Sequence, residues 1–328
     1  MSILVGFSIE CRSEGRSASG PLDSSARHEI VKKRNRASNR SETNNESIDF
    51  KSISQLNFEH TIKPQRAKTR AQDRTVKNEK KSTAKNAAIS VIVVNCRSLR
   101  NKVAELHHLV GSSGASVIIG TESWLTDDIS DSEVFPKGFD IYRKDRWNRS
   151  GGGVFIAVKN TIASQAVTLP DSEIESVWCS FRCSKSRKVY VCSYYRPPDT
   201  DAHSIFELER QIMNITSKDS GVNLIIGGDF NAPSVDWRTY SYIPGGRDRE
   251  VCEALVGMFT LNCLEQLATT ANRGENILDL LATNIPDKVI NVDTMDGISD
   301  HRVVTARFLL EVNLSLIHIS EPTRLRRI

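Results

Sequence analysis

The chain has 328 residues, of which 39% are hydrophobic, and a net charge of +4, so its length suits one large domain or two small ones. No apolar run approaches the roughly 18–20 residues that span a bilayer, and the first residues lack the basic and apolar regions of a signal peptide. Seven cysteines with no C-x-x-C pair argue against a disulfide framework and against a zinc site. We therefore expect an intracellular protein with reduced thiols and no membrane partner.

The positive charge belongs to the N-terminal part of the chain. Residues 1–88 hold 18 Lys and Arg against 10 Asp and Glu, whereas the remaining residues hold 26 against 30. The same segment contains three Phe, no Tyr and no Trp, too little apolar surface to offset chain entropy. We predict a disordered basic region over 1–88. Within it, residues 63–85 carry nine basic residues against two acidic ones, which fits a phosphate-binding arm, a nuclear-import signal or a solvated linker.

Apolar runs predict an ordered domain over 89–312. Strands are expected, in chain order, at 90–95, 116–122, 153–159, 177–182, 188–195, 224–230, 277–283, 289–293 and 303–312. Helical spacing of apolar residues occurs at 101–110, at 205–215 and again at 251–258. Many strands with few helices between them favour an α/β fold in which two packed sheets are flanked by helices.

Polar side chains follow several of these apolar runs. One predicted strand passes through two glycines into Asp229 and Asn231. Glycines at such a place allow another backbone or a phosphate to approach closely, and strand ends in α/β sheets are where ligands bind. A simple strand-to-loop turn is the alternative. Asn95, Glu122 and Asp300 stand beside other apolar runs, so several strand ends are expected to converge on one site.

The residue types at these ends suit phosphodiester chemistry. Hydrolysis of a phosphodiester needs a hard cation, a positioned water and a donor to the phosphoryl oxygens. Mg²⁺ takes one or two carboxylates and keeps several waters, and Glu122 offers one, with Asn95, Asp229 or Asp300 as its neighbour. His301 can pair with Asp279, because an aspartate that orients an imidazole serves acid–base work or holds a charged ring against a phosphate.

Seven short motifs occur in an order that is far more specific than any one of them. They are Asn95-Cys-Arg-Ser, Thr121-Glu-Ser-Trp, Gly151-Gly-Gly-Val, Tyr195-Arg-Pro-Pro, Gly228-Asp-Phe-Asn, Leu278-Asp-Leu-Leu and Ser299-Asp-His. With this set the chain resembles the endonuclease/exonuclease/phosphatase superfamily, and most closely the apurinic-type endonuclease domain of non-LTR (LINE-like) retrotransposons. The resemblance covers about residues 89–312. It implies a four-layer α/β sandwich, with two packed mixed β-sheets flanked by helices.

The resemblance also implies the activity, which is hydrolysis of nucleic-acid phosphodiester bonds with Mg²⁺, for which Mn²⁺ can substitute. Glu122 is implied as the main metal ligand, assisted by Asn95, with Asp300 close to the metal. Asp229 is implied to position or activate the attacking water, or to handle the leaving-group proton, while Asn231 orients the Asp229 carboxylate. A structural alternative for Asn95 is that it caps the end of its strand.

The remaining implied roles concern the phosphate. His301, paired with Asp279, is implied to contact the scissile phosphate, and Tyr195 to lend its hydroxyl to the phosphoryl oxygens. Packing of Tyr195 in the core is the structural alternative. Adjacent strand residues alternate, so Tyr194 is expected to face the other way. Arg97 is expected to bind the substrate, and its alternative is an ion pair beside the site.

Two departures from repair enzymes favour the retroelement branch. Repair-type apurinic endonucleases usually continue the first Asn into Gly-Leu-Arg and the metal Glu into Thr-Lys, whereas here Asn95 precedes Cys-Arg-Ser and Glu122 precedes Ser-Trp-Leu. The expected function is therefore DNA nicking at a target site by a monomeric, nuclear protein with no obligate protein partner. A reverse transcriptase is expected to follow such a domain, and no polymerase-like sequence does. Residues 313–328 break from the pattern, resemble translated adapter sequence and are expected to form a non-domain tail.

The residues also allow two alternative functions. One is a phosphatase of the same superfamily that acts on a small phosphorylated molecule or a lipid. The other is an inactive retroelement fragment that binds nucleic acid through its basic arm.

Overall fold

The computed structural model describes residues 88–147, 150–183, 187–198, 200–219 and 221–312, all of which belong to one compact unit. The predicted disordered region 1–88, apart from its last residue, and the predicted tail 313–328 lie outside the described residues. Among the described helices, none is long and apolar enough to cross a membrane.

Two six-stranded mixed sheets form the centre of the domain. The first contains, in spatial order, β13 (Val289–Met295), β14 (Val303–Leu309), β1 (Ala88–Asn95), β2 (Val117–Thr121), β4 (Val154–Lys159) and β3 (Phe139–Lys144). The second contains β11 (Glu265–Gln266), β12 (Asp279–Thr283), β8 (Asn223–Asp229), β7 (Lys188–Tyr195), β6 (Glu175–Arg182) and β5 (Ser164–Ala166). A separate two-stranded ribbon pairs β9 (Val235–Asp236) with β10 (Ser241–Tyr242).

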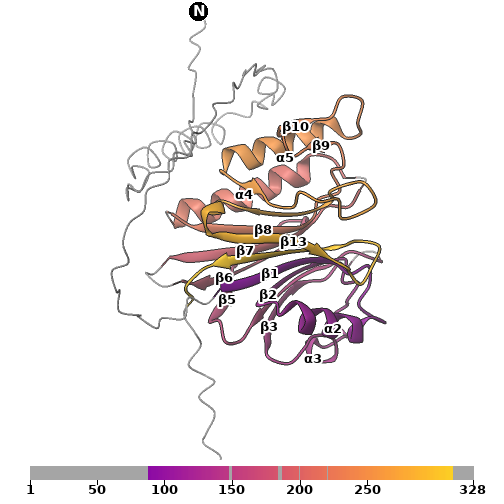
Figure 1. The fold of residues 1–328 in the computed structure, drawn as a ribbon, viewed down its shortest axis with the longest axis vertical. Coiled ribbons are helices and arrows are strands. Elements are labelled where there is room, and N and C mark those ends of the chain that lie inside the picture. Colours follow the sequence, from indigo (N-terminus) through magenta and orange to yellow (C-terminus); the bar gives the residue numbers. More distant parts are fainter. Residues whose placement is uncertain (1–87, 148–149, 184–186, 199, 220, 313–328) are drawn as a thin grey trace, which may run out of the picture. The chain divides into compact units, whose positions relative to one another are not determined.

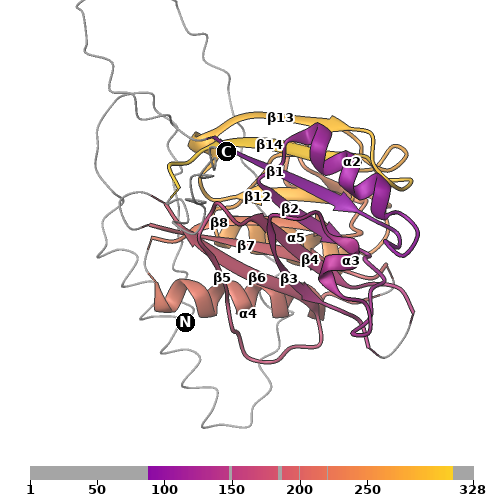
Figure 2. The same cartoon turned by 90° about the horizontal axis from the view of Figure 1, so that it is seen from below.

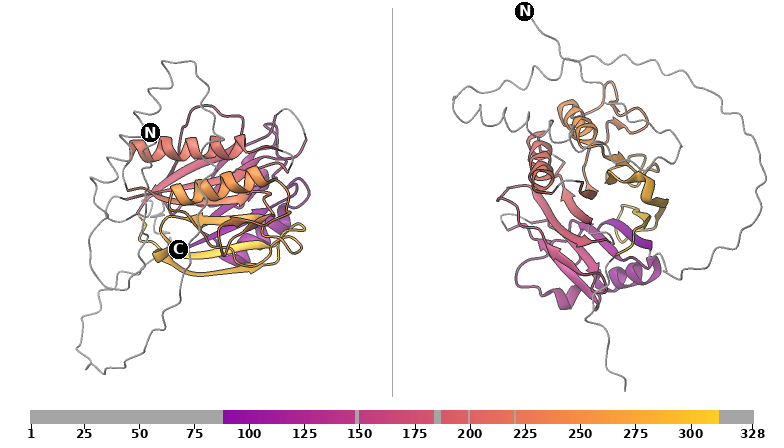
Figure 3. Two further views of the ribbon diagram at one scale, coloured as in Figure 1. Left: turned by 90° about the horizontal axis from the view of Figure 1, so that it is seen from above. Right: turned by 90° about the vertical axis from the view of Figure 1, so that its left-hand side faces the viewer.

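Helices cover the outer face of each sheet, so the domain has four layers (Figure 1). Their bounds are α2 (Val103–Ser113), α3 (Asp131–Val134), α4 (His203–Lys218) and α5 (Arg249–Leu261), with a short 3₁₀ turn at Pro286–Lys288. The α2 and α3 helices lie on the first sheet (Figure 2), and α4 and α5 lie beside each other on the second (Figure 3). This arrangement confirms the predicted four-layer α/β sandwich.

Three apolar clusters hold the layers together. The middle cluster lies between the sheets and includes Val93 and Ile119 from the first and Val191 and Ile225 from the second, all fully buried. Gly227 belongs to the same contact, because a Cβ there would lie 2.7 Å from a methyl group of Val93. The absence of a side chain at this position lets the two sheets approach at the end that carries the polar residues.

The helices bury the faces that their spacing predicted. In α4 the buried residues Ile205, Leu208, Ile212 and Ile215 recur at intervals of three and four, and α5 buries Val251, Leu255 and Met258 with the same period. The sequence prediction missed β3, β5 and the two-residue strands β9, β10 and β11. The strand β3 mixes apolar with charged residues and β5 reads Ser-Gln-Ala, so neither shows the apolar run from which a strand is inferred.

The topology contains one parallel strand pair in each sheet. In the first sheet β1 runs parallel to β2, and α2 connects them; in the second sheet β7 runs parallel to β8, and α4 connects them. Each unit is thus a β-α-β crossover. Because the carboxyl ends of parallel strands meet at one edge of a sheet, each unit brings two chain positions together there.

Candidate active site

The candidate site lies where the two crossovers end. Asn95 is the last residue of β1, and Glu122 directly follows β2. Tyr195 and Asp229 are the last residues of β7 and β8, and they are paired in the sheet register. Asp279 begins the antiparallel strand β12 opposite Asp229. Side chains paired in register on neighbouring strands point to the same face, so this edge of the second sheet presents a row of polar groups.

The amide of Asn95 joins the two sheets at this point. Its Nδ2 donates to Oε1 of Glu122 at 3.0 Å and to Oδ2 of Asp229 at 2.9 Å. Its Oδ1 accepts the backbone N–H of Arg97 at 3.1 Å. With 1% of its surface exposed, Asn95 does more than close a strand end. It holds one carboxylate from each sheet in a fixed position.

Asp229 is a buried carboxylate that is more basic than an exposed one. Burial, and after it the negative charge of Asp279, raise the pKa of Asp229 well above its ordinary value. Its Oδ1 accepts the backbone N–H of Asn231 at 3.0 Å. Asn231 adopts a left-handed backbone (φ +46°) and donates its Nδ2 to the carbonyl of Arg196 at 2.8 Å. The loop after β8 is therefore folded tightly around the carboxylate.

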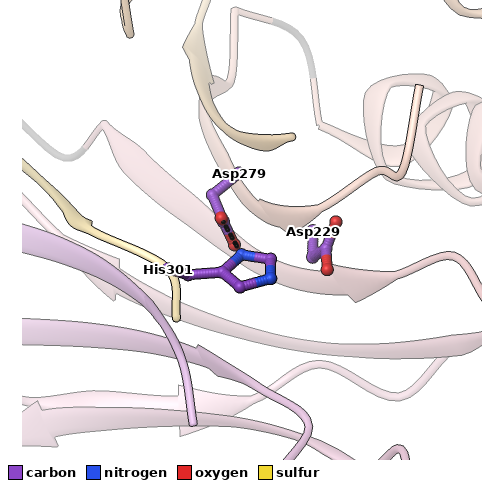
Figure 4. A group of neighbouring side chains, drawn as sticks. All are labelled: Asp229, Asp279 and His301. Atoms are coloured by element: carbon purple, nitrogen blue, oxygen red, sulfur yellow. Dashed lines mark hydrogen bonds and ion pairs between the residues drawn. The ribbon is translucent and has the colours of Figure 1, made fainter. Parts of the chain in front are cut away.

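His301 and Asp279 form a buried pair. Nδ1 of His301 lies 2.5 Å from Oδ2 of Asp279, and both side chains are at most 2% exposed. Burial lowers the pKa of His301, but the hydrogen bond to Asp279 and the charge of that carboxylate outweigh it, so the pKa lies above its ordinary value. In Figure 4 the imidazole lies between the two carboxylates, with its second nitrogen on the side of Asp229.

Tyr195 lies beside the carboxylates, with its hydroxyl protonated. Burial raises its pKa, and the charges of Glu122 and Asp229 raise it further. Tyr194 faces the opposite side of the sheet, where it packs on Phe230 with ring centroids 4.9 Å apart. The alternation of neighbouring strand residues thus separates a site tyrosine from a core tyrosine.

An ion pair that the sequence did not suggest lies over Tyr195. The guanidinium of Arg146 is 5.6 Å from the centre of the Tyr195 ring and is bonded to Glu175. Glu175 also accepts the backbone N–H of Gly153 at 2.6 Å. A side chain at Gly152 would collide with both ionic partners. The Gly-Gly-Gly motif therefore makes room for the pair, and no local motif marks Arg146 or Glu175 as its members.

Two further residues outside the predicted set hold the site together. Asn272 is 1% exposed, accepts the backbone N–H groups of Leu278 and Asp279 through Oδ1, and donates Nδ2 to the Asp279 carbonyl at 2.6 Å. Ser299 donates its hydroxyl to the Asn95 carbonyl at 2.7 Å and accepts the His301 N–H at 3.2 Å. Ser299 is part of a quoted motif, whereas the sequence around Asn272 gives no signal.

Asp300 and Arg97 occupy the exposed edge of the site. Asp300 Oδ1 lies 2.9 Å from Arg97, and Oδ2 lies 3.2 Å from Arg273. Burial raises the pKa of Asp300, but the bond from Arg97 and the charge of Arg273 outweigh it, so that pKa is lowered. The structure therefore places the Asp300 carboxylate between two arginines, one of which is Arg97.

Two groups of side chains are candidates for holding a cation. Asp229, Asp279 and His301 have ligand atoms within 4.8 Å of one another. However, two ligands at right angles around Mg²⁺ lie about 3 Å apart, whereas the His301–Asp279 contact of 2.5 Å is a hydrogen bond. Glu122 offers hard carboxylate oxygen atoms at a half-buried position, which suits Mg²⁺ better. Asn95 beside it is buried, and its Oδ1 already accepts the Arg97 N–H. Burial raises the pKa of the nearby Cys96 thiol, so a thiolate ligand is not offered.

Comparisons with known proteins agree with this geometry. Residues 189–305 match the family model described as endonuclease-reverse transcriptase. The structure is similar to the endonuclease domain of TRAS1, a telomere-specific non-LTR retrotransposon, with a TM-score of 0.54 and 18% identity over 68% of this chain and 98% of that one. No curated protein sequence matches the chain.

Two further structures are similar to the same extent. The apurinic endonuclease LMAP from Leishmania major gives a TM-score of 0.56 with 13% identity over 67% of this chain and 87% of that one. The catalytic domain of APE2 from Xenopus laevis gives 0.54 with 16% identity over 70% and 94%. At such identities the likeness concerns the fold.

The fold is the α/β sandwich that this chain shares with these endonuclease structures. The family match extends over the part that holds Tyr195, Asp229, Asp279 and His301, and together with the shared fold it supports an assignment to the endonuclease/exonuclease/phosphatase superfamily.

Proposed function

We propose that this protein is a Mg²⁺-dependent endonuclease that hydrolyses phosphodiester bonds of DNA. One observation carries the proposal: the Asn95 amide bonds a carboxylate from each sheet, Glu122 and Asp229, at the point where both crossovers end. This arrangement combines a cation site with a basic carboxylate next to it. The superfamily assignment and the endonuclease named in the matching family model support nucleic acid as the substrate.

Glu122 would hold the cation, and the bond from Asn95 Nδ2 to Oε1 would fix the orientation of its carboxylate. When bound there, Mg²⁺ neutralises charge on the phosphoryl oxygens and polarises the phosphorus centre. Mn²⁺ favours similar oxygen ligands and would substitute. The chain itself supplies the groups that position water and phosphate.

Asp229 would accept a proton from the attacking water. Its raised pKa makes it a stronger base than an exposed aspartate, which suits proton abstraction near neutral pH. Asn231 fixes the carboxylate through its backbone N–H, since that bond leaves Asp229 little freedom to rotate. The Asp229 carboxylate would also orient the water that it deprotonates.

His301 and Tyr195 would donate to the phosphoryl oxygens. Asp279 raises the pKa of His301 and so favours the charged imidazolium, whose second nitrogen lies on the side of Asp229. Tyr195 remains a neutral donor, because its raised pKa prevents ionisation at neutral pH. Donors of this kind stabilise the charge that develops in the transition state.

The retroelement role is the finer part of the proposal. It rests on the description of the matching family and on the fold shared with a retrotransposon endonuclease. We further propose that the protein acts as a monomer in the nucleus. A basic segment at 63–85 would support import, and microscopy of a fluorescent fusion with and without this segment tests it.

Incubation of the full chain with supercoiled plasmid, with Mg²⁺ or with EDTA, tests the activity. We expect nicking that requires the metal and is lost in Asp229→Asn. Absence of nicking by the wild type, with release of phosphate from a small phosphorylated molecule instead, would favour the phosphatase alternative. Absence of both activities in a folded protein would favour the inactive fragment.

A further inference from the structure

Asp300 connects two arginines that come from different loops. Arg97 lies in the loop between β1 and α2, and Arg273 lies in the loop before β12. Arg97 uses one terminal nitrogen for Asp300, and Arg273 uses Nε and one terminal nitrogen, at distances of 2.9–3.2 Å. We call these three residues the arginine bracket. It adjoins His301 in the chain and carries a net charge of +1.

The backbone on both sides of the bracket is fixed. The N–H of Arg97 bonds to the side chain of Asn95, and its carbonyl accepts Nζ of Lys102 at 3.0 Å. The loop of Arg273 is held by the buried Asn272, whose carbonyl accepts the N–H of Arg302 at 2.7 Å. The guanidinium groups therefore extend from rigid supports, which lowers the entropy lost when they bind a ligand.

The bracket has free capacity to bind an anion. A guanidinium carries five N–H donors, and Asp300 takes one group from Arg97 and two from Arg273. The two arginine side chains are 57% and 40% exposed, so their other donors face solvent beside the site. Two guanidinium groups that share one carboxylate remain net positive. Planar forks of this kind match the oxygen atoms of a phosphate.

We propose that Arg97 and Arg273 bind backbone phosphates next to the scissile one, and that Asp300 positions these arginines and is not a metal ligand. This assignment rests on the proposed nuclease function and adds a second anchoring site to it. The ligand is the nucleic-acid backbone, because it offers further phosphates beside the scissile one, whereas a substrate with a single phosphate at His301 offers none to the bracket.

Binding of a labelled DNA duplex in EDTA, followed by fluorescence anisotropy at about 50–200 mM KCl, tests the arginines without cleavage. On duplex DNA each neutralised phosphate contributes about 0.9 to the slope of log affinity against log salt. We expect Arg97→Gln and Arg273→Gln each to flatten that slope by about 0.9, and the double variant by about twice as much. Arg97→Lys and Arg273→Lys should keep the wild-type slope, because a lysine still neutralises a phosphate.

Arg182→Gln is the matched control. Arg182 is exposed at the opposite end of β6 from Glu175, roughly 23 Å away at about 3.3 Å per residue. It should keep the wild-type slope. Slopes of the two bracket variants that equal the wild-type value, in proteins whose near-ultraviolet dichroism is native, would overturn the phosphate assignment.

The role of Asp300 is tested by the Mg²⁺ concentration that gives half-maximal nicking. We expect this concentration to be unchanged in Asp300→Asn and raised in Glu122→Gln. A rise of similar size in both would overturn the positioning role and make Asp300 a metal ligand. A wild-type protein that binds DNA with the expected bracket slopes but never nicks it would reject the nuclease function and leave the phosphate-binding site intact.

Discussion

The buried Asp279–His301 pair allows a prediction in which the sign of a stability effect changes with pH. Asp279→Asn removes the charge of the carboxylate and keeps its shape. The carboxylate is fully buried, and among the described residues its hydrogen bond is to the imidazole, 2.5 Å long. Its second oxygen has no hydrogen-bond partner among the described residues. Asp279 is therefore stabilised mainly by the charge of His301.

The sign of the effect follows from the directions of the two pKa shifts, and its size from the strength of a charge-assisted hydrogen bond. The pKa of His301 is raised in the folded state, so its pairing with Asp279 contributes fully below the unfolded pKa near 6.5 and is lost as the pH rises through the folded value. At pH 6 a charge-assisted bond of this kind is worth about 1.5–3 kcal/mol. Burial raises the pKa of Asp279 itself, so above the folded pKa of His301 the carboxylate is a buried charge without a cation.

Urea unfolding of the full chain at pH 6 and pH 9, followed by near-ultraviolet dichroism, is the measurement. We expect Asp279→Asn to lower the free energy of unfolding by about 1.5–3 kcal/mol at pH 6 and to have no effect or a stabilising one at pH 9. Glu253→Gln, which breaks an exposed pair with Arg249 on α5, is the control and should cost below about 1 kcal/mol at both pH values. A loss that is equal at pH 6 and pH 9 would refute the pairing as the source of the raised pKa of His301.

Three further results are expected. Glu122→Gln should keep the thermal midpoint but abolish nicking at ordinary Mg²⁺ concentrations, and unchanged activity would contradict its role as a ligand. Asp279→Asn and His301→Ala should each slow single-turnover nicking by about 10²–10⁴-fold, and the double variant by little more because the pair acts as one unit; losses that multiply would contradict this. Gly228→Ala should destabilise the protein by more than about 2 kcal/mol, since the φ of Gly228 is +139° and a Cβ there would strike the Tyr194 carbonyl. Gly257→Ala in α5 has open space around it and should stabilise the protein by up to about 1 kcal/mol. Equal melting midpoints for these two glycine variants would refute the steric argument.

The sequence was sufficient to predict the strands that are buried and end in polar residues. Asn95, Tyr195 and Asp229 close continuous apolar runs, which is the pattern of a central strand. The strands β3 and β5 were not predicted, because β3 mixes apolar with charged residues over Phe139–Lys144 and β5 contains only Ser-Gln-Ala. Neither has a fully buried residue, and an apolar run reports burial.

The site was predictable to the extent that its residues lie in local motifs. The contact of Arg146 with Glu175 spans 29 residues of sequence and depends on two strands and a glycine loop that meet only in the fold. The same holds for Asn272, which is connected to Asp279 through backbone groups that any residue possesses. Such contacts leave no mark in a single sequence, since neither partner has an unusual neighbour in the chain.

The bridge that Asn95 forms between the sheets makes the activity a reporter of sheet docking. Glu122 stands on the first sheet and Asp229 on the second, and the amide that spaces them crosses the interface. A slip of about 1 Å between the two layers would stretch one bond of this amide beyond hydrogen-bonding range, although every strand kept its own ladder. During gradual heating we therefore expect nicking to be lost before far-ultraviolet dichroism changes, because the catalytic geometry belongs to the seam between the layers and not to either layer.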